Sequence, residues 1–249
     1  MGSQGATRRG FRVVEAAVFT VLVYAATIVL QVYQPVTGGY FNVGESMIYL
    51  AALISTPLIA GVAGGVGAAL ADLSTGYAIF APGTLVIKFI EGYVAGVLVK
   101  KFKKYHGLLQ VALAVALYTV AFLAVSVTLW SGGIYVGPWQ WLEYTFTPPY
   151  VYVATAVWIA IAIALASLVL FILLKKYLTS GEIAALAAAG SLMVLGYFLY
   201  EYFVSNPLTG REPAGALFEV PVNIGQVVAG VSISVPLAAW LRRAGYAKS

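Results

Sequence analysis

Cysteine is absent from this chain of 249 residues, and charged residues make up only 9% of it. The lack of cysteine excludes disulfides, thiolate nucleophiles and iron–sulfur ligation. A soluble domain carries roughly a quarter charged residues, so the scarcity of charge excludes an ordinary soluble domain. No Walker A loop, zinc-protease motif or nucleophile elbow occurs. We therefore expect a protein that is not an enzyme, with no catalytic residues, cofactor or metal.

Long apolar runs take the place of the missing charge. Residues 13–33, 108–130 and 151–174 are each long enough to cross about 30 Å of hydrocarbon as a helix. None of them alternates apolar and polar residues as the strands of a membrane barrel do. The first run is also too long for the apolar core of a cleavable signal peptide. The sequence predicts an all-α polytopic protein of the cell (plasma) membrane, with residues 1–249 in a single domain.

The number of crossings depends on residues 45–74, which are long for one span and short for two. Pro57 lies midway, where it would break or kink a helix. Lys and Arg are enriched in cytoplasmic loops, and two short antiparallel segments leave only Arg211 outside, with Lys88 inside the membrane. Basic residues placed by this rule are no evidence for nucleic-acid binding. We expect eight helices with both termini cytoplasmic, the remaining spans lying at 84–100, 183–204 and 221–241.

Small residues recur at four-residue spacing on two of the expected helices. Gly61, Gly65 and Ala69 form one such face, and Gly92 and Gly96 form another. Small residues let membrane helices approach closely, so we expect these faces to pack against neighbouring helices.

Polar side chains inside the membrane gather near the outer ends of the helices. A charge at the bilayer centre costs at least ~2.5–3.5 kcal/mol on insertion scales and is read by default as functional. We expect Lys88 to pair with Glu91 and Asp72; a purely structural ion pair is the alternative. Glu45 is explained by the preference for acids at helix starts. The candidate substrate-binding residues are Asn42, Asp72, Lys88, Glu91, Tyr197, Glu201, Asn223 and Gln226.

The segment 34–44 is a candidate lid over this cluster. It carries Pro35, Gly38 and Gly39 together with the aromatic residues Tyr40 and Phe41. Most other aromatic residues on this side are expected to form an interfacial belt. Apolar walls with a few converging polar groups are the usual form of a small-molecule pocket, so we expect an outward-facing binding site.

Residues 38–98 resemble the substrate-binding S components of energy-coupling factor (ECF) transporters, in the branch that includes riboflavin-type and hydroxymethylpyrimidine-type proteins. Residues 196–203 and 220–230 resemble the last two helices of that family. The motifs that carry the resemblance are Gly39-Tyr40-Phe41-Asn42-Val43-Gly44-Glu45, Ala71-Asp72-Leu73, Gly76-Tyr77 and Pro82-Gly83-Thr84-Leu85-Val86-Ile87-Lys88.

The resemblance implies a core of six helices with an inserted block. Residues 11–106 would hold the first four core helices and residues 178–243 the last two. Residues 107–177 would add two transmembrane helices and the aromatic loop 131–149. An even number of added crossings leaves the orientation of the later helices unchanged.

The resemblance also implies a function. An S component of this kind captures a water-soluble vitamin or vitamin precursor outside the cell. It then associates in the bilayer with a transmembrane coupling subunit and two ATPase subunits, tips over and releases its substrate inside. The family uses a small-residue face on its first helix for the coupling subunit, and the nearest equivalents here are Ala16, Ala17 and Thr20.

Two other classes of function stay open on the sequence. One is a stand-alone secondary transporter coupled to protons through Glu91 and Asp72. The other is a non-transporting subunit of a membrane complex, in which polar side chains hold helices together. The identity of the vitamin and the role of the inserted helices are not fixed by the sequence.

Overall fold

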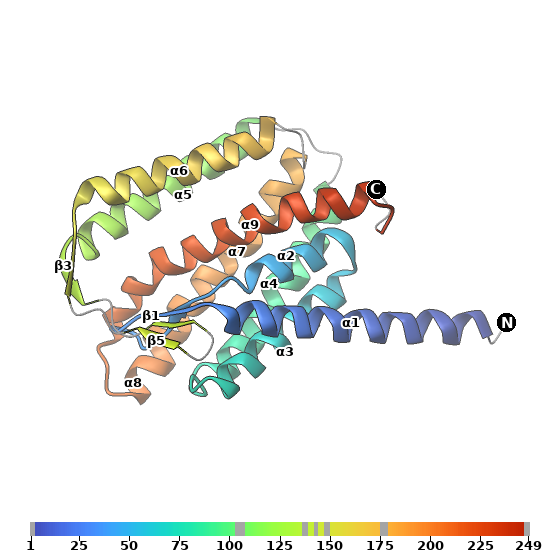
Figure 1. Ribbon diagram of the computed structural model, residues 1–249, viewed down its shortest axis with the longest axis horizontal. Coiled ribbons are helices and arrows are strands. Elements are labelled where there is room, and N and C mark those ends of the chain that lie inside the picture. Colours follow the sequence, from blue (N-terminus) through green and yellow to red (C-terminus); the bar gives the residue numbers. More distant parts are fainter. Residues whose placement is uncertain are drawn as a thin grey trace.

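The protein is a bundle of long helices with two small sheets at one end, seen here in a computed structural model (Figure 1). The structure describes residues 3–102, 108–135, 139–141, 144–146, 150–174 and 179–246. The helices are α1 (Ser3–Val29), α2 (Glu45–Ile54), α3 (Pro57–Ser74), α4 (Ala81–Phe102), α5 (Leu108–Leu129), α6 (Thr155–Leu174), α7 (Ser180–Tyr200), the π-helix η1 (Glu201–Ser205), α8 (Asn206–Leu208), the 3₁₀-helix η2 (Pro213–Phe218) and α9 (Glu219–Arg243). The strands are β1 (Gln31–Tyr33), β2 (Tyr40–Phe41), β3 (Gly132–Tyr135), β4 (Trp139–Trp141), β5 (Tyr144–Phe146) and β6 (Tyr150–Val153).

The predicted class, an all-α polytopic membrane protein, is confirmed. Among the described residues, five helical segments are long and apolar enough to cross a membrane: Gly10–Val29, Pro57–Ser74, Ala81–Phe102, Gly181–Leu208 and Pro213–Arg243. The two ends of the chain lie at the same end of the bundle (Figure 1). The count of eight crossings and the cytoplasmic side of the termini stay predictions.

The helix break expected near Pro57 is confirmed. Helix α2 ends at Ile54 and α3 starts at Pro57, which occupies the first turn, where its missing N–H costs nothing. Thr56 caps α3, since its hydroxyl accepts a hydrogen bond from the Ile59 N–H at 3.3 Å. With ten residues, α2 rises about 15 Å and reaches only part of the way through a bilayer.

Each glycine face packs against a neighbouring helix, as predicted, and the structure shows that the two faces meet each other. A Cβ built on Gly65 would lie 2.5 Å from the Leu85 carbonyl oxygen, and one on Gly96 would lie 2.7 Å from the Pro57 Cα. Since no side chain fits in either place, α3 and α4 are in backbone contact along their length. The acidic and basic residues of α3 and α4 are therefore carried by one tightly packed pair of helices.

Two apolar runs predicted as continuous helices are partly strand, and the predicted bounds 13–33 and 151–174 are wrong there. Helix α1 ends at Val29 and residues 31–33 form β1, which pairs with β2 in the register Val32↔Phe41 and Tyr33↔Tyr40. Tyr150–Val153 forms β6 before α6 begins at Thr155. Hydropathy measures apolar length and does not distinguish a short strand from the next helical turn.

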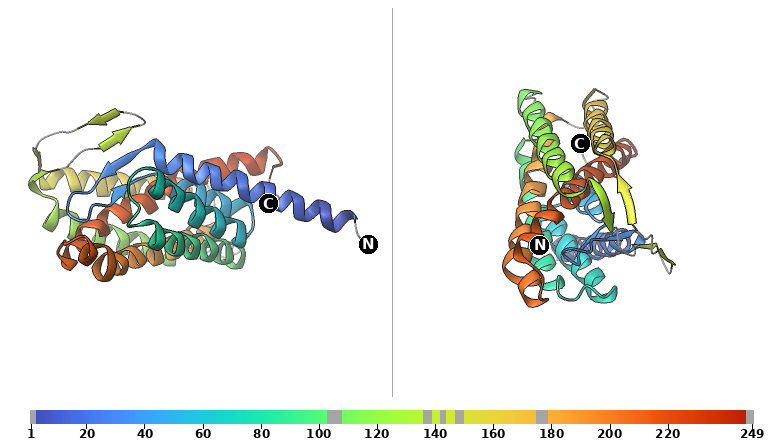
Figure 2. Two further views of the ribbon diagram at one scale, coloured as in Figure 1. Left: turned by 90° about the horizontal axis from the view of Figure 1, so that it is seen from below. Right: turned by 90° about the vertical axis from the view of Figure 1, so that its left-hand side faces the viewer.

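The inserted block lies on one side of the bundle. Helices α5 and α6 run side by side next to α7 and α9, while α1 to α4 lie on the other side (Figures 1 and 2). The Trp130 indole donates to the Phe218 carbonyl oxygen at 3.2 Å, and the Trp158 indole donates to the Trp130 carbonyl oxygen at 2.8 Å. These bonds tie the pair to the start of α9.

The aromatic segment 131–149 is not a simple loop. Its strands β4 and β5 pair with each other, and β4 also pairs with β1 in the register Gln31↔Gln140 and Val32↔Trp139. The resulting sheet has the order β2-β1-β4-β5, so the insertion extends the hairpin formed by the segment after α1. The division of the chain into core and inserted helices stays a prediction.

At the end of the bundle that holds the termini, one arginine joins three helices. The Arg242 guanidinium on α9 donates to Glu182 Oε1 on α7 at 2.8 Å and to the Leu53 carbonyl oxygen of α2 at 2.9 Å. Glu182 is itself fixed by a capping box with Thr179. A cation at the C-terminal end of α2 complements the helix dipole.

Candidate functional site

A small polar cavity lies at the hairpin end of the bundle, away from the termini. It is enclosed by α1, the β1–β2 hairpin, α3, α4, α7 with η1, and α9. Its volume is about 30 Å³, enough for one or two water molecules. The lining residues are Thr27, Gly39, Tyr40, Asn42, Ala68, Asp72, Phe80, Thr84, Lys88, Tyr197, Glu201, Glu219, Asn223 and Gln226.

Seven of the eight candidate residues line this cavity, although they come from five separate parts of the chain. They are Asn42, Asp72, Lys88, Tyr197, Glu201, Asn223 and Gln226. Each of these side chains is buried or half-buried in the protein, so none of them points toward lipid. The eighth candidate, Glu91, is fully buried and lies beside Lys88, outside the lining.

Lys88 has a different set of partners from the one predicted. Its ammonium forms ion pairs with Glu45, on the first turn of α2, and with Glu91 at 3.4 Å. The predicted partner Glu91 is confirmed, whereas the predicted pairing with Asp72 is wrong. Because α2 packs against α4, the Glu45 side chain reaches the ammonium from the neighbouring helix. Glu45 begins α2, as expected, but its carboxylate neutralises Lys88 and does not only favour the helix start.

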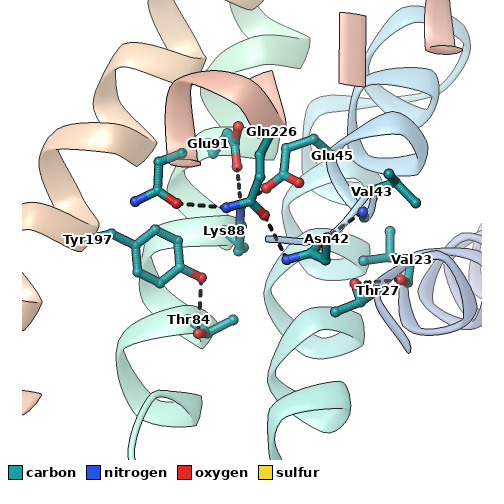
Figure 3. A network of polar contacts seen from close by, with 12 residues as sticks. Val23, Thr27, Asn42, Val43, Glu45, Thr84, Lys88, Glu91, Tyr197 and Gln226 are labelled. Atoms are coloured by element: carbon teal, nitrogen blue, oxygen red, sulfur yellow. Dashed lines mark hydrogen bonds and ion pairs between the residues drawn. The ribbon is translucent and has the colours of Figure 1, made fainter. Parts of the chain in front are cut away.

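Glu91 is also held from a second side. The Tyr49 hydroxyl on α2 donates to Glu91 Oε1 at 2.7 Å (the ion pair of Glu91 with Lys88 is drawn in Figure 3). Lys88, Glu45, Glu91 and Tyr49 thus form a buried network between α2 and α4, beneath the cavity. An ion pair with these additional hydrogen bonds satisfies the requirement that buried charges be paired.

The Tyr197 ring forms one wall of the cavity. Its hydroxyl donates to Thr84 Oγ1 at 3.0 Å, and the Lys88 ammonium lies 5.2 Å from the ring centroid (Figure 3). A cation over an aromatic face is attracted by the ring. The bond to Thr84 fixes the ring between α7 and α4.

The β1–β2 hairpin closes the cavity through three side-chain hydrogen bonds, one to α3 and two to α9. Thr37 donates to Glu219 Oε2 at 2.6 Å, Tyr40 donates to Asp72 Oδ1 at 2.5 Å, and Asn42 donates to Gln226 Oε1 at 2.7 Å. Burial and the neighbouring Asp72 raise the pKa of Tyr40 well above its usual value, so its hydroxyl stays a donor. We call residues 34–44 the lid, the role that the sequence predicts for them.

The amides of the site form a chain. Asn42 donates to Gln226, and Gln226 Nε2 in turn donates to Asn223 Oδ1 at 2.7 Å (Figure 3 shows the Asn42–Gln226 bond). Asn223 and Gln226 stand three residues apart on α9 and therefore share one face. Asn42 Oδ1 accepts from the Gly44 N–H at 2.8 Å, which fixes the turn before α2.

Several polar atoms of the site have no hydrogen-bond partner among the described residues. They include Asp72 Oδ2, Glu201 Oε2 and Asn223 Nδ2, on side chains that are 1% or 2% exposed. A buried polar group without a partner costs about 1–3 kcal/mol, so such groups call for an explanation. All three residues line the cavity, where a guest molecule would meet them.

Glu201 lies inside a helix that runs on past residue 204, where the predicted span 183–204 ends. The helix continues through the π-turn η1 into α8, and the Asn206 N–H donates to the Glu201 carbonyl oxygen. Pro207 has no N–H to donate and crowds the preceding turn, which accounts for the widening. Single π-turns inside α-helices are frequent at functional sites.

Sequence reasoning missed Glu219, Thr27 and Ala68 as lining residues. Glu219 precedes Asn223 by four residues and Gln226 by seven, so its place on their face of α9 could have been found from the spacing. Thr27 and Ala68 give no such signal, because their role depends on how α1 and α3 pack.

The three residues proposed for a partner interface do not share one environment. Ala16 is half-buried and lines a groove of about 470 Å³ between α1 and the start of α3. The Thr20 carbonyl oxygen lies against Gly67 of α3, where a Cβ would be 2.7 Å away. Ala17 is exposed. Another protein can therefore reach Ala17 and the groove that Ala16 lines, whereas Thr20 packs against α3.

Residues 11–132 match the model of a protein family described as "ECF-type riboflavin transporter, S component". The chain belongs to this family. The match covers α1 to α5 and ends in β3, so the resemblance drawn above for residues 196–203 and 220–230 lies outside it. S components are transport proteins and not enzymes, and this S component is a multi-pass protein of the plasma membrane that serves vitamin uptake.

A relative of this S component is known from Pyrococcus woesei, where it is described as "Uncharacterized protein in gap 3'region". It is 38% identical over 112 residues, which are 45% of this chain and 75% of the relative. No solved structure matches the chain.

Proposed function

We propose that this S component captures a water-soluble vitamin or vitamin precursor from outside the cell in the cavity beneath the lid. The observation that carries the proposal is the convergence of seven predicted residues on one buried cavity, in a chain of the S-component family. Unpartnered polar atoms on Asp72, Glu201 and Asn223 supply the hydrogen bonds that a polar ring would need. Apolar walls from Ala68, Phe80 and the Tyr197 ring would cover its faces.

Substrate entry requires the lid to move. A cavity of about 30 Å³ is too small for a heterocycle, and the lid is the segment that closes it. The lid is held to the helices by three side-chain bonds, whose acceptors are Glu219, Asp72 and Gln226. All three acceptors line the cavity, so the groups that hold the lid would also meet the substrate. Binding and lid closure would therefore be coupled.

Delivery to the cytoplasm would depend on partner subunits, namely a coupling subunit in the membrane and two ATPases. We place the coupling subunit at the groove next to Ala16 and Ala17. Its walls are mostly apolar and come from α1, the start of α3 and α4, with Arg12 at one edge. The parts of α1 and α3 that line this groove lie toward the end of the bundle that holds the termini, away from the β1–β2 hairpin (Figure 1).

Uptake by proteoliposomes tests the proposal. The S component is reconstituted with the coupling subunit and the ATPases of its source organism, and accumulation of radiolabelled vitamins is measured with internal or external ATP. We expect uptake that requires the complete set of subunits and ATP. Uptake by the S component alone that stops when the proton gradient is dissipated would instead establish the proton-coupled transporter.

Ligand binding to the purified protein tests the site residues. We expect Glu201→Gln and Asn223→Ala to weaken binding of the transported vitamin while the unfolding temperature stays close to that of the wild type. Glu212→Gln is the matched control, because Glu212 is exposed on the same side of the molecule and its side chain is outside the cavity. Unchanged affinity in both site variants would refute their role.

A further inference from the structure

Acidic side chains far outnumber basic ones around the cavity. Glu45, Asp72, Glu91, Glu201 and Glu219 are each 3% exposed or less, and among the described residues Lys88 is the one buried cation near them. Arg211 contacts the lid at Gly38 but does not line the cavity. An ionised carboxylate is costly to bury without a cation, so these groups either stay protonated or need a positive charge from elsewhere.

Lys88 does not meet that need, because its charge is already taken. Its ammonium is paired with both Glu45 and Glu91, neither of which lines the cavity. The three carboxyl groups that do line it belong to Asp72, Glu201 and Glu219, and none of them forms an ion pair among the described residues. An anionic guest would meet these three acids and a lysine that is already neutralised.

The hydrogen-bonding pattern of the cavity also disfavours an anionic guest. Asp72 Oδ2 and Glu201 Oε2 are acceptors without donors, and each belongs to a side chain that is at most 2% exposed. They are supplied by different helices, α3 and the π-turn after α7. A guest with N–H donors on two sides would satisfy both, and charge-assisted bonds of this type are about twice as strong as neutral ones.

The acids are also spread too far to hold a metal ion together. In the part of the chain that the structure describes, no group of three acidic or histidine side chains lies close enough for that purpose. An organic molecule whose charge and donors are distributed over a ring therefore fits these carboxyl groups better than a metal ion does.

We propose that the substrate of this S component is a small organic cation with N–H donors, of the aminopyrimidinium or ammonium class, held between Asp72 and Glu201 with Glu219 nearby. This inference rests on the proposed function and narrows it. Lys88 then stays paired with Glu45 and Glu91 at the base of the cavity and does not bind an anionic group of the substrate.

Two measurements on the full-length purified protein test the charge of the substrate. First, the protein is purified from rich medium, and any retained small molecule is identified by native mass spectrometry after release. Second, binding of thiamine, an organic cation with an aminopyrimidine, is compared by calorimetry with binding of neutral riboflavin and of the anions biotin and pantothenate. We expect a retained cation, or thiamine bound at least ten-fold more tightly than the other three.

Variants tie the result to the two acids. We expect Asp72→Asn and Glu201→Gln each to weaken binding of the cation by about thirty-fold or more, the loss typical when one partner of a buried charge pair is removed. Glu212→Gln should leave it unchanged. Unfolding temperatures of all three variants show whether each one folds.

The outcomes separate this inference from the function on which it rests. If riboflavin or an anion is the tightest ligand or the retained one, the protein is still a vitamin-binding S component and the cationic substrate is refuted. If no small molecule is retained and none of the four compounds binds, both the proposed function and the cationic substrate fail. If the cation binds but neither acid matters, the assignment to Asp72 and Glu201 is wrong.

Discussion

Lys88 and Glu45 form a buried ion pair that joins the first turn of α2 to the middle of α4. Lys88 is 3% exposed and Glu45 is completely buried. Glu91 completes the arrangement from the same helix as Lys88. Lys88 lines the cavity while Glu45 and Glu91 lie behind it, so the same network that joins two helices also affects the charge of the binding site.

Replacing one partner of this ion pair should destabilise the protein more than replacing both partners. We expect Lys88→Gln to lower the free energy of unfolding by roughly 3–5 kcal/mol, because it leaves the buried carboxylates of Glu45 and Glu91 without a cation. The double variant Glu45→Gln/Lys88→Gln should recover part of that loss, because it removes one of the two unpaired acids. Unfolding by SDS titration in mixed micelles measures the wild type and both variants, and a double variant less stable than Lys88→Gln would contradict the interpretation.

The hydroxyl of Thr37 should decide how often the lid opens. Thr37→Val removes the donor to Glu219 and should shift the lid toward open states by about five-fold or more, since losing a buried hydrogen bond costs about 1–3 kcal/mol. Because the chain has no cysteine, spin labels at Val36→Cys and Ala78→Cys report the distance between the lid and the loop before α4. We expect a broader distance distribution; Thr128→Val, at an exposed intrahelical bond, should leave it unchanged.

Contact between α3 and α4 should not tolerate even one methyl group. A Cβ at Gly65 would lie 2.5 Å from the Leu85 carbonyl oxygen, so Gly65→Ala should destabilise the protein by about 1–3 kcal/mol through overpacking. Gly10→Ala is the matched control, because a Cβ there meets nothing within 4 Å and alanine favours the helix by up to about 1 kcal/mol. Equal stability of the two variants in SDS titration would show that the helices can separate freely.

Pairing between β4 and β1 should restrain the lid from outside. Replacing residues 139–146 with a Gly/Ser segment of equal length removes β4, which pairs with β1, together with β5, and β1 then becomes an edge strand. With the same pair of spin labels we expect a wider distance distribution and faster ligand release. An unchanged unfolding temperature would confirm that α5 and α6 still pack; an unchanged distance distribution would show that the insertion does not act on the lid.

Much of the site could be predicted because buried charge is rare in an apolar chain. Asp72, Lys88 and Glu201 stand out at once in such surroundings, and the topology count put them at the same end of the bundle. The partner of Lys88 could be predicted only in part. Glu91 lies three residues away on the same helix, whereas Glu45 reaches Lys88 through helix packing that periodicity does not contain.

Other features could not be predicted because hydropathy and spacing do not record them. Gln31–Tyr33 reads as the end of an apolar helix and becomes a strand only because Tyr40–Phe41 folds back onto it. The π-turn at Glu201–Ser205 changes the register by one residue without any change in hydropathy, and Pro207 marks the place of the irregularity but not its kind. Glu219 was missed because it precedes the expected span 221–241, although its spacing to Asn223 gives the correct face.

Arg242 limits where this protein can deform. One guanidinium serves Glu182 on α7 and the last turn of α2 at once, so these helices cannot spread apart there without leaving both acceptors stranded. Substrate entry would then deform only the hairpin end of the bundle, and the rest of the protein would move as a rigid body. The tipping over in the bilayer that the resemblance implies would need that stiffness, and the two bonds of Arg242 contribute to it.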